Sequence, residues 1–126
     1  MKRGDVVFWK GFSFDDGEKS DGLLVVVGSE IGGRLLLLKT TSQSSAHRPD
    51  VDGCHSDASV FRFKQNLGGF RSPTWIQFDP PIILTPQQVI ENAPRVLFEL
   101  QLDDLGAIVT CYKESLEISD ALMAFL

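Results

Sequence analysis

The sequence predicts one α+β domain in which strands come first and helices gather toward the end. Short apolar runs bounded by glycine, proline or small polar residues are spread over the chain as far as residue 78. Helix-start signals and apolar residues at helical spacing occur only beyond that point. The 126 residues contain no repeat, low-complexity tract or long linker, and this length suits a single domain with its own core. We therefore expect one domain over residues 1–126.

Three apolar runs near the start are expected to form strands. Val6–Trp9 is short, rich in strand-forming residues and bounded by glycine. Leu23–Val27 and Leu35–Thr40 begin as continuous apolar runs without alternation, which predicts central strands covered on both faces. Gly32 and Gly33 precede the third run and are typical of a hairpin turn. These runs predict a small, strongly curved antiparallel sheet with a helix packed on one side.

The middle of the chain predicts a long loop followed by two more strands. Residues 42–59 are rich in Ser, His, Pro, Asp and Gly and carry no periodic signal, so we expect a loop there. Val60–Lys64 and Thr74–Phe78 alternate between apolar and polar residues, as half-exposed strands do. Pro80 and Pro81 are expected to end the second of these strands, because proline donates no ladder hydrogen bond.

A short helix is expected directly after the last strand. Thr85 is a good helix cap, Pro86 suits the first turn, and Gln88 follows three residues after the cap. Pro94 is expected to end this helix, because proline is poorly tolerated inside one.

A longer helix is expected to begin at Asp103 and Asp104, whose carboxylates suit the positive end of the helix dipole. Its apolar residues recur at helical spacing and are expected in the core: Leu105, Ile108, Val109 and Tyr112. Ser119 is expected to begin a last helical turn or two. The apolar stripe that follows, residues 122–126, suits packing either on this domain or on a second subunit.

The charge balance disfavours one class of function. The net charge is −5, whereas nucleic-acid binding through a broad basic patch needs clustered Lys and Arg. A compact cleft can still be locally positive. Four basic residues are candidates for RNA binding: Arg48, Arg62, Lys64 and Arg71. Phe61 and Phe63 alternate with two of them and are expected to fill the core, since they point to the opposite face of the strand.

The two cysteines lie far apart in unlike surroundings. Cys54 belongs to a polar run and Cys111 to an apolar helical pattern, so we expect reduced thiols, as in a cytoplasmic protein. No signal peptide is visible near the start, and the apolar runs are too short to span a membrane. Cys54 and His55 are adjacent and lack a second pair at ligand spacing, so no metal site is expected.

Three motifs in the first part of the chain occur in an informative order. The chain opens with Gly4–Val7, continues with a loop over Phe12–Ser20 that reads FSFDDGEKS, and reaches Lys39–Gln43 after the third strand. In this order the motifs resemble those of the MazF/PemK family of toxin endoribonucleases. The resemblance implies an SH3-like barrel of the MazF/PemK/CcdB kind with C-terminal helices. It also implies a cytoplasmic homodimer, an antitoxin partner and single-stranded RNA as the substrate.

The resemblance also assigns roles to single residues. Thr41, with Ser42, is implied to position the scissile phosphate for attack by the ribose 2′-hydroxyl, without a metal or cofactor. The family has an Arg-Pro pair where this chain has Asp21 and Gly22. Loss of one oxyanion-stabilising group costs about two to three orders of magnitude in rate, and a carboxylate also repels the phosphate. Lys19 is the candidate substitute cation, and we expect endoribonuclease activity that is weak or lost.

An alternative interpretation is a non-enzymatic, SH3-like protein-interaction module. It would present Trp9, Phe12 and Phe14, with the acidic loop, to a protein partner. The net charge and Asp21 favour this interpretation, whereas Lys39–Gln43 favours the ribonuclease family. The same Thr-Thr-Ser-Gln run equally suits a strand end that makes local backbone hydrogen bonds.

Overall fold

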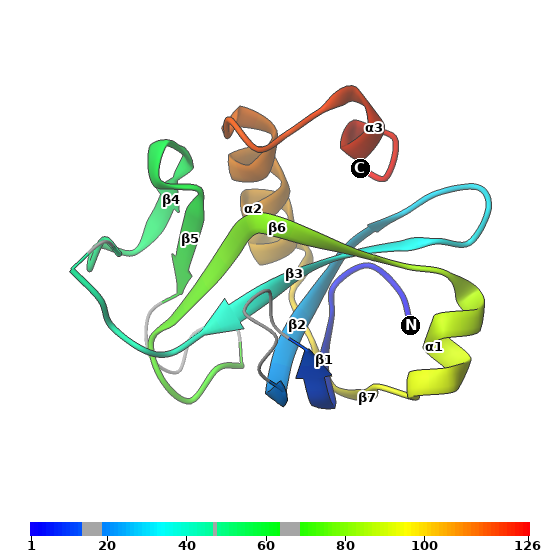
Figure 1. Ribbon diagram of the computed structural model, residues 1–126. Helices are drawn as coiled ribbons and strands as arrows, with labels where there is room; N and C mark the ends of the chain where they lie inside the picture. Colours follow the sequence, from blue (N-terminus) through cyan, green and yellow to red (C-terminus); the bar gives the residue numbers. More distant parts are fainter. Residues whose placement is uncertain (14–18, 47, 64–68) are drawn as a thin grey trace.

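One antiparallel sheet organises the chain, with helix α2 on one side of it (Figure 1). The computed structural model describes residues 1–13, 19–46, 48–63 and 69–126, and gives only the backbone for 12, 13 and 19–21. The strands are β1 (Asp5–Ser13), β2 (Lys19–Ser29), β3 (Leu35–Thr41), β4 (Gly53–His55), β5 (Val60–Phe63), β6 (Thr74–Leu84) and β7 (Arg95–Glu99). The helices are α1 (Pro86–Asn92), α2 (Leu102–Glu114) and α3 (Asp120–Met123), with a short 3-10 helix, η1 (Ser56–Ala58).

The strands of the described residues follow the order β4-β5-β6-β3-β2-β1-β7. Every pairing is antiparallel. The two end strands, β4 and β7, are not paired with each other in the described part of the chain, so the hydrogen-bonded sheet is open there. Strands first and helices toward the end confirm the predicted α+β class.

Both faces of the sheet are covered, as the continuous apolar runs predict. In β2, Val25 and Val27 belong to the larger core, whereas Leu24 and Val26 belong to a smaller cluster on the opposite face. All four side chains are fully buried. The smaller cluster is covered by partly buried side chains: Met1, Trp9, Ile82 and Val89.

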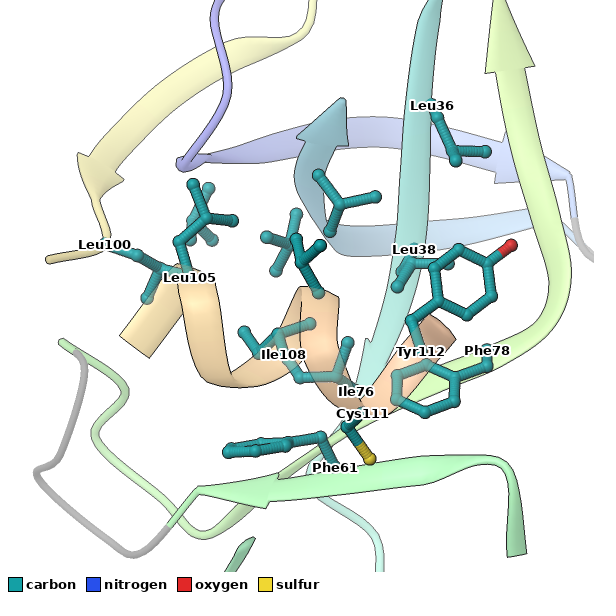
Figure 2. Close-up of a cluster of buried hydrophobic side chains, with 14 of the residues drawn as sticks. Leu36, Leu38, Phe61, Ile76, Phe78, Leu100, Leu105, Ile108, Cys111 and Tyr112 are labelled. Atoms are coloured by element: carbon teal, nitrogen blue, oxygen red, sulfur yellow. The ribbon is translucent and has the colours of Figure 1, made fainter. Parts of the chain in front are cut away.

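Helix α2 packs on the larger core. Its residues Leu105, Ile108, Val109 and Tyr112 are all buried, which confirms their predicted place. Figure 2 shows this helix face beside Phe61 and Phe78. The predicted core position of Phe61 and Phe63 is confirmed as well.

Aromatic side chains connect β5, the strand next to β4, with the end strand β7. The ring of Phe70 lies 5.6 Å from that of Phe63 in β5 and 5.3 Å from that of Phe98 in β7, measured between centroids. Gly69, just before it, has a φ of +98° and lies directly under the Phe98 ring. Side-chain packing thus links β5 and β7 where the hydrogen-bond ladder does not.

β6 continues through Pro80 and Pro81, so the prediction that these prolines end the strand is wrong. They lie where the register between β3 and β6 shifts. The pairs that flank the shift are Leu37–Ile82 and Lys39–Gln77. Residues 78–81 therefore bulge opposite a single residue of β3, and proline is tolerated there because the ladder does not use its missing amide.

Two strands are absent from the sequence prediction. β4 and η1 lie within the expected loop 42–59, and β7 follows Pro94. β4 has only three residues, and most of β7 is exposed. Neither segment carries the apolar alternation that marks a strand in sequence.

Cys54 and Cys111 form a disulfide, with their Cα atoms 5.5 Å apart, so the prediction of reduced thiols is wrong. The two residues are 57 positions apart in sequence, and their unlike surroundings hid the pairing. The fold brings them together because β4 turns back against α2.

The C-terminal apolar stripe packs on its own domain. Phe125 is buried in the larger core, and Leu122 and Leu126 pack against that core. The backbone amide of Ser29 donates a hydrogen bond of 3.1 Å to the Phe125 carbonyl oxygen. The Arg34 guanidinium lies over the Phe125 ring, 5.5 Å from its centroid.

Candidate functional site

The hydroxyls at the end of β3 are engaged in contacts within the chain. Thr40 donates a hydrogen bond of 2.9 Å to the Leu23 carbonyl on β2. The Thr41 hydroxyl accepts one of 3.3 Å from the Gln43 amide. This second contact is a local hydrogen bond to the backbone, of the kind expected if the Thr-Thr-Ser-Gln run simply ends a strand. Ser42, the other predicted catalytic residue, is exposed beside it.

Arg48 lies on the same turn. Its guanidinium donates a hydrogen bond of 2.8 Å to the Gln43 carbonyl oxygen. Gln43 therefore accepts from Arg48 through its carbonyl and donates to Thr41 through its amide. The structure brings Thr41 and Arg48 together around one backbone residue.

Arg62 and Trp75 hold the next part of the segment against β5 and β6. Arg62 forms an ion pair with Asp52, and its guanidinium lies 5.1 Å from the centroid of the Trp75 ring. Trp75 donates a hydrogen bond of 2.7 Å from its indole nitrogen to the Pro49 carbonyl. The Arg62 side chain is only 15% exposed. Its charge is thus balanced within the chain.

A surface pocket of about 470 Å³ opens beside this corner. Its lining comes from the segment after β3, from η1 and β5, from β6 and from the turn after α2: Ser45, Arg48, Asp57, Ala58, Ser59, Val60, Gln77, Asp79 and Glu117. Among the described residues of this lining, Asp57, Asp79 and Glu117 are carboxylates, and Arg48 is the single cation. The pocket therefore carries more negative than positive charge at neutral pH.

A hydrogen bond joins two walls of the pocket, and two of its carboxylates influence the pKa of the core residue Tyr112. The Ser59 hydroxyl donates a hydrogen bond of 3.1 Å to Glu117, which links the η1 side to the turn after α2. Burial, and then the charges of Glu117 and Asp79, raises the pKa of Tyr112 to about 12. The Tyr112 hydroxyl is buried and has no hydrogen-bond partner among the described residues. Figure 2 shows it at the far edge of the Tyr112 ring, directed away from Ile108.

The remaining predicted site residues lie elsewhere. Lys19 and Asp21 lie at the start of β2, in residues 19–21, of which only the backbone is described. Lys64 lies outside the described residues. Arg71 is exposed in the turn before β6. It contributes nothing to the pocket lining.

Of the three aromatic residues assigned to a protein-interaction surface, the structure describes the side chain of Trp9 alone. Trp9 is partly buried against the smaller core, on the face of the sheet opposite α2. Phe12 is described by its backbone alone, in β1, and Phe14 lies outside the described residues.

Sequence reasoning missed the carboxylates of the pocket. Asp57, Asp79 and Glu117 are far apart in the chain and belong to no motif. Only the pairing of β5 with β6 and the position of α2 bring them to one opening. No local signal in the sequence could have found them.

Across the described ranges, no three His, Cys, Asp or Glu side chains are grouped in a way that could hold a metal ion. Likewise, none of the helices in these ranges has the length and apolar character needed to cross a membrane. No family model matches the chain, and neither curated proteins nor solved structures provide a match.

Proposed function

We propose that the chain is a divergent protein of the MazF/PemK toxin fold that binds a basic segment of a partner protein, with metal-free endoribonuclease activity weak or lost. Three observations support the fold: the motifs between residues 4 and 43, the meander β1-β2-β3 with β6 beside β3, and helix α2 packed on the sheet. The aromatic bridge from β5 to β7 suits the SH3-like barrel that this family implies.

The charge of the pocket beside β3 carries the functional part of the proposal. Its described lining has three carboxylates and one guanidinium, so an RNA phosphate would meet net repulsion from these groups. A lysine or arginine side chain is complementary to the same lining. Ser59 and Gln77 add uncharged hydrogen-bonding groups to the walls. A basic antitoxin segment is therefore the partner class that this surface suits best.

The groups that would cleave RNA are poorly disposed for that reaction. Thr41 accepts a backbone hydrogen bond, Arg48 donates to a backbone carbonyl, and Arg62 is paired with Asp52. Transition-state stabilisation needs a cation aimed at the developing charge, and the aligned position carries Asp21. This arrangement supports the proposal of weak or absent cleavage.

Incubation with a long single-stranded RNA in the presence of a metal chelator tests the catalytic half. We expect little or no cleavage above the buffer control, in the wild type or in Asp21→Arg. Rapid cleavage by the wild type that Thr41→Ala abolishes would overturn this half of the proposal.

Calorimetric titration with a hexalysine peptide tests the binding half. We expect binding that weakens with added salt, and Asp79→Asn or Glu117→Gln should each weaken it by about two- to fivefold. Asp103→Asn makes the same charge change at the other end of α2, outside the pocket, and should leave the affinity unchanged. An equal loss in all three variants would show attraction to the net charge alone and would contradict a pocket site.

The family resemblance further implies a homodimer. Light scattering at several protein concentrations measures the molar mass in solution, and we expect about twice the mass of one chain. A single-chain mass at every concentration would contradict this part of the proposal.

A further inference from the structure

The Cys54–Cys111 disulfide joins an exposed strand to a buried helix. Cys54 is the middle residue of β4 and is exposed to solvent. Cys111 is 1% exposed and belongs to the larger core. Figure 2 shows its sulfur projecting from α2 beside Phe61. A thiol in solution can therefore approach this bond only from the Cys54 side.

The disulfide anchors one wall of the pocket. In the described part of the chain β4 pairs with β5 alone, over three residue pairs, so its ladder is short. The chain passes directly from β4 into η1 and then to Ser59. Asp57 and Ala58 of η1, together with Ser59, form part of the pocket lining. The Ser59–Glu117 hydrogen bond is a second link between this wall and the end of α2.

Opening the disulfide would release β4 and leave the core in place. No residue of β4 belongs to either apolar cluster, so the strand has little burial of its own. A reduced Cys111 would stay in the core, because a buried thiol behaves as a small apolar side chain. Segments with few buried contacts open at a low free-energy cost, independently of the central strands.

We propose that Cys54–Cys111 is a thiol–disulfide exchange site through which a dithiol reductant loosens the β4–η1 wall of the pocket. A reductant thiolate attacks the Cys54 sulfur and forms a mixed disulfide, while Cys111 leaves as a thiolate and takes a proton. The second thiol of the reductant, as a thiolate, then attacks the reductant's first sulfur in the mixed disulfide, and Cys54 leaves as a thiolate and takes a proton. The protein gains two electrons and two protons, and the dithiol becomes a disulfide. The consequence for binding rests on the function proposed above.

Hydrogen exchange measured by mass spectrometry tests the inference on the whole chain, oxidised and after reduction with dithiothreitol. At short labelling times we expect peptides over 53–60 to exchange about tenfold faster or more after reduction. Peptides over 24–27 and 36–38, from the buried parts of β2 and β3, should keep their protection. Unchanged exchange over 53–60 would overturn the inference, and so would an equal loss of protection in β2 and β3.

Two further measurements test the inference, one on a variant without the disulfide and one on the wild-type protein. Cys54→Ser keeps Cys111 in the core, and it should show the reduced pattern without reductant and no response to it. Glutathione captured by rapid acid quenching should be attached to Cys54. A glutathione adduct on Cys111 would contradict the direction of attack.

The hexalysine titration separates this inference from the proposed function. Weaker binding by the reduced protein, with faster exchange over 53–60, supports both. Faster exchange over 53–60 with no peptide binding in either redox state supports the exchange site and overturns the binding function. Equal binding in both states with unchanged exchange supports the binding function and overturns the exchange site.

Discussion

Gly28 in β2 lies against the backbone of Phe125, so closely that a Cβ built on Gly28 would stand 2.2 Å from the Phe125 carbonyl oxygen. The same oxygen accepts the hydrogen bond from the Ser29 amide. The register of β2 with β3 shifts between Val26 and Gly28, which brings this part of the strand against the C-terminal segment. A side chain at position 28 would force that segment off the sheet.

Gly28→Ala should therefore lower the free energy of unfolding by about 1–3 kcal/mol, the usual cost of overpacking. Urea denaturation gives the value. Gly106→Ala is the matched control, because a Cβ at Gly106 meets nothing within 4 Å and the residue lies inside α2. Alanine is the better helix former, so the control should gain about 0.5–1 kcal/mol. A harmless Gly28→Ala would contradict the close packing of Phe125.

Gly69→Ala tests the aromatic bridge between β5 and β7. Gly69 has a φ of +98°, and a Cβ there would lie 2.7 Å from the Phe98 ring. Gly53 has a φ of +103° with nothing within 4 Å of its Cβ, so Gly53→Ala carries the backbone strain alone. We expect the Gly69 variant to lose about 1–3 kcal/mol more than the Gly53 variant in thermal or urea unfolding. Equal losses would mean that Phe98 moves aside without cost.

Tyr112 should make stability depend on alkaline pH. Its pKa is raised from 10.0 to about 12, by burial first and then by Glu117 and Asp79. Because the folded state holds the proton more tightly, the stabilisation is full below pH 10 and is lost as the pH rises through 12. Urea unfolding at a series of pH values measures the loss. In Tyr112→Phe this component should be missing.

The chain has a single tyrosine, so ultraviolet absorbance of the phenolate reports on Tyr112 alone. A midpoint near pH 10 in the folded protein would contradict the buried environment. The Tyr112→Phe variant should also be about 1 kcal/mol more stable at neutral pH, because it removes a buried hydroxyl that has no partner among the described residues.

Thr85→Ala should destabilise the start of α1. The Thr85 hydroxyl accepts from the Gln88 amide at 3.1 Å, and the Gln88 side chain accepts from the Thr85 amide at 2.9 Å. Loss of this capping box should cost about 1 kcal/mol in unfolding free energy. Thr85→Ser keeps the hydroxyl and should retain most of the stability. If both variants behave alike, the hydrogen bond is not the source of the effect.

The parts of the fold that were predictable are those with a strong local signal. β2 and β3 each contain a continuous apolar run, Leu23–Val27 and Leu35–Leu38, and α1 carries its own cap, so their existence follows from neighbouring residues. β7 exists because it pairs with β1, and β4 because it pairs with β5 and is bonded to α2. Such elements depend on residues distant in sequence, and no local pattern marks them.

The candidate site likewise combines a local contact with contacts between residues that are distant in sequence. The Thr41–Gln43 turn could be read from its motif, because the hydrogen bond is local. The ion pair of Arg62 with Asp52 and the carboxylates of the pocket depend on the path of the segment between β3 and β5. Charge placement across strands requires the register, which single-sequence reasoning does not supply.

Because β2 is buried on both faces, its burial does little to fix its alignment with the neighbouring strands during folding. A one-residue slip normally moves a strand's apolar side chains into water, and this penalty selects the correct alignment. In β2 the slip would only exchange one apolar set for the other, Leu24 and Val26 for Val25 and Val27. The correct alignment then depends on side-chain size near the end of the strand, where Gly28 leaves room for the C-terminal segment. Substitutions at Gly28 should consequently favour misaligned chains as well as weaken the native one.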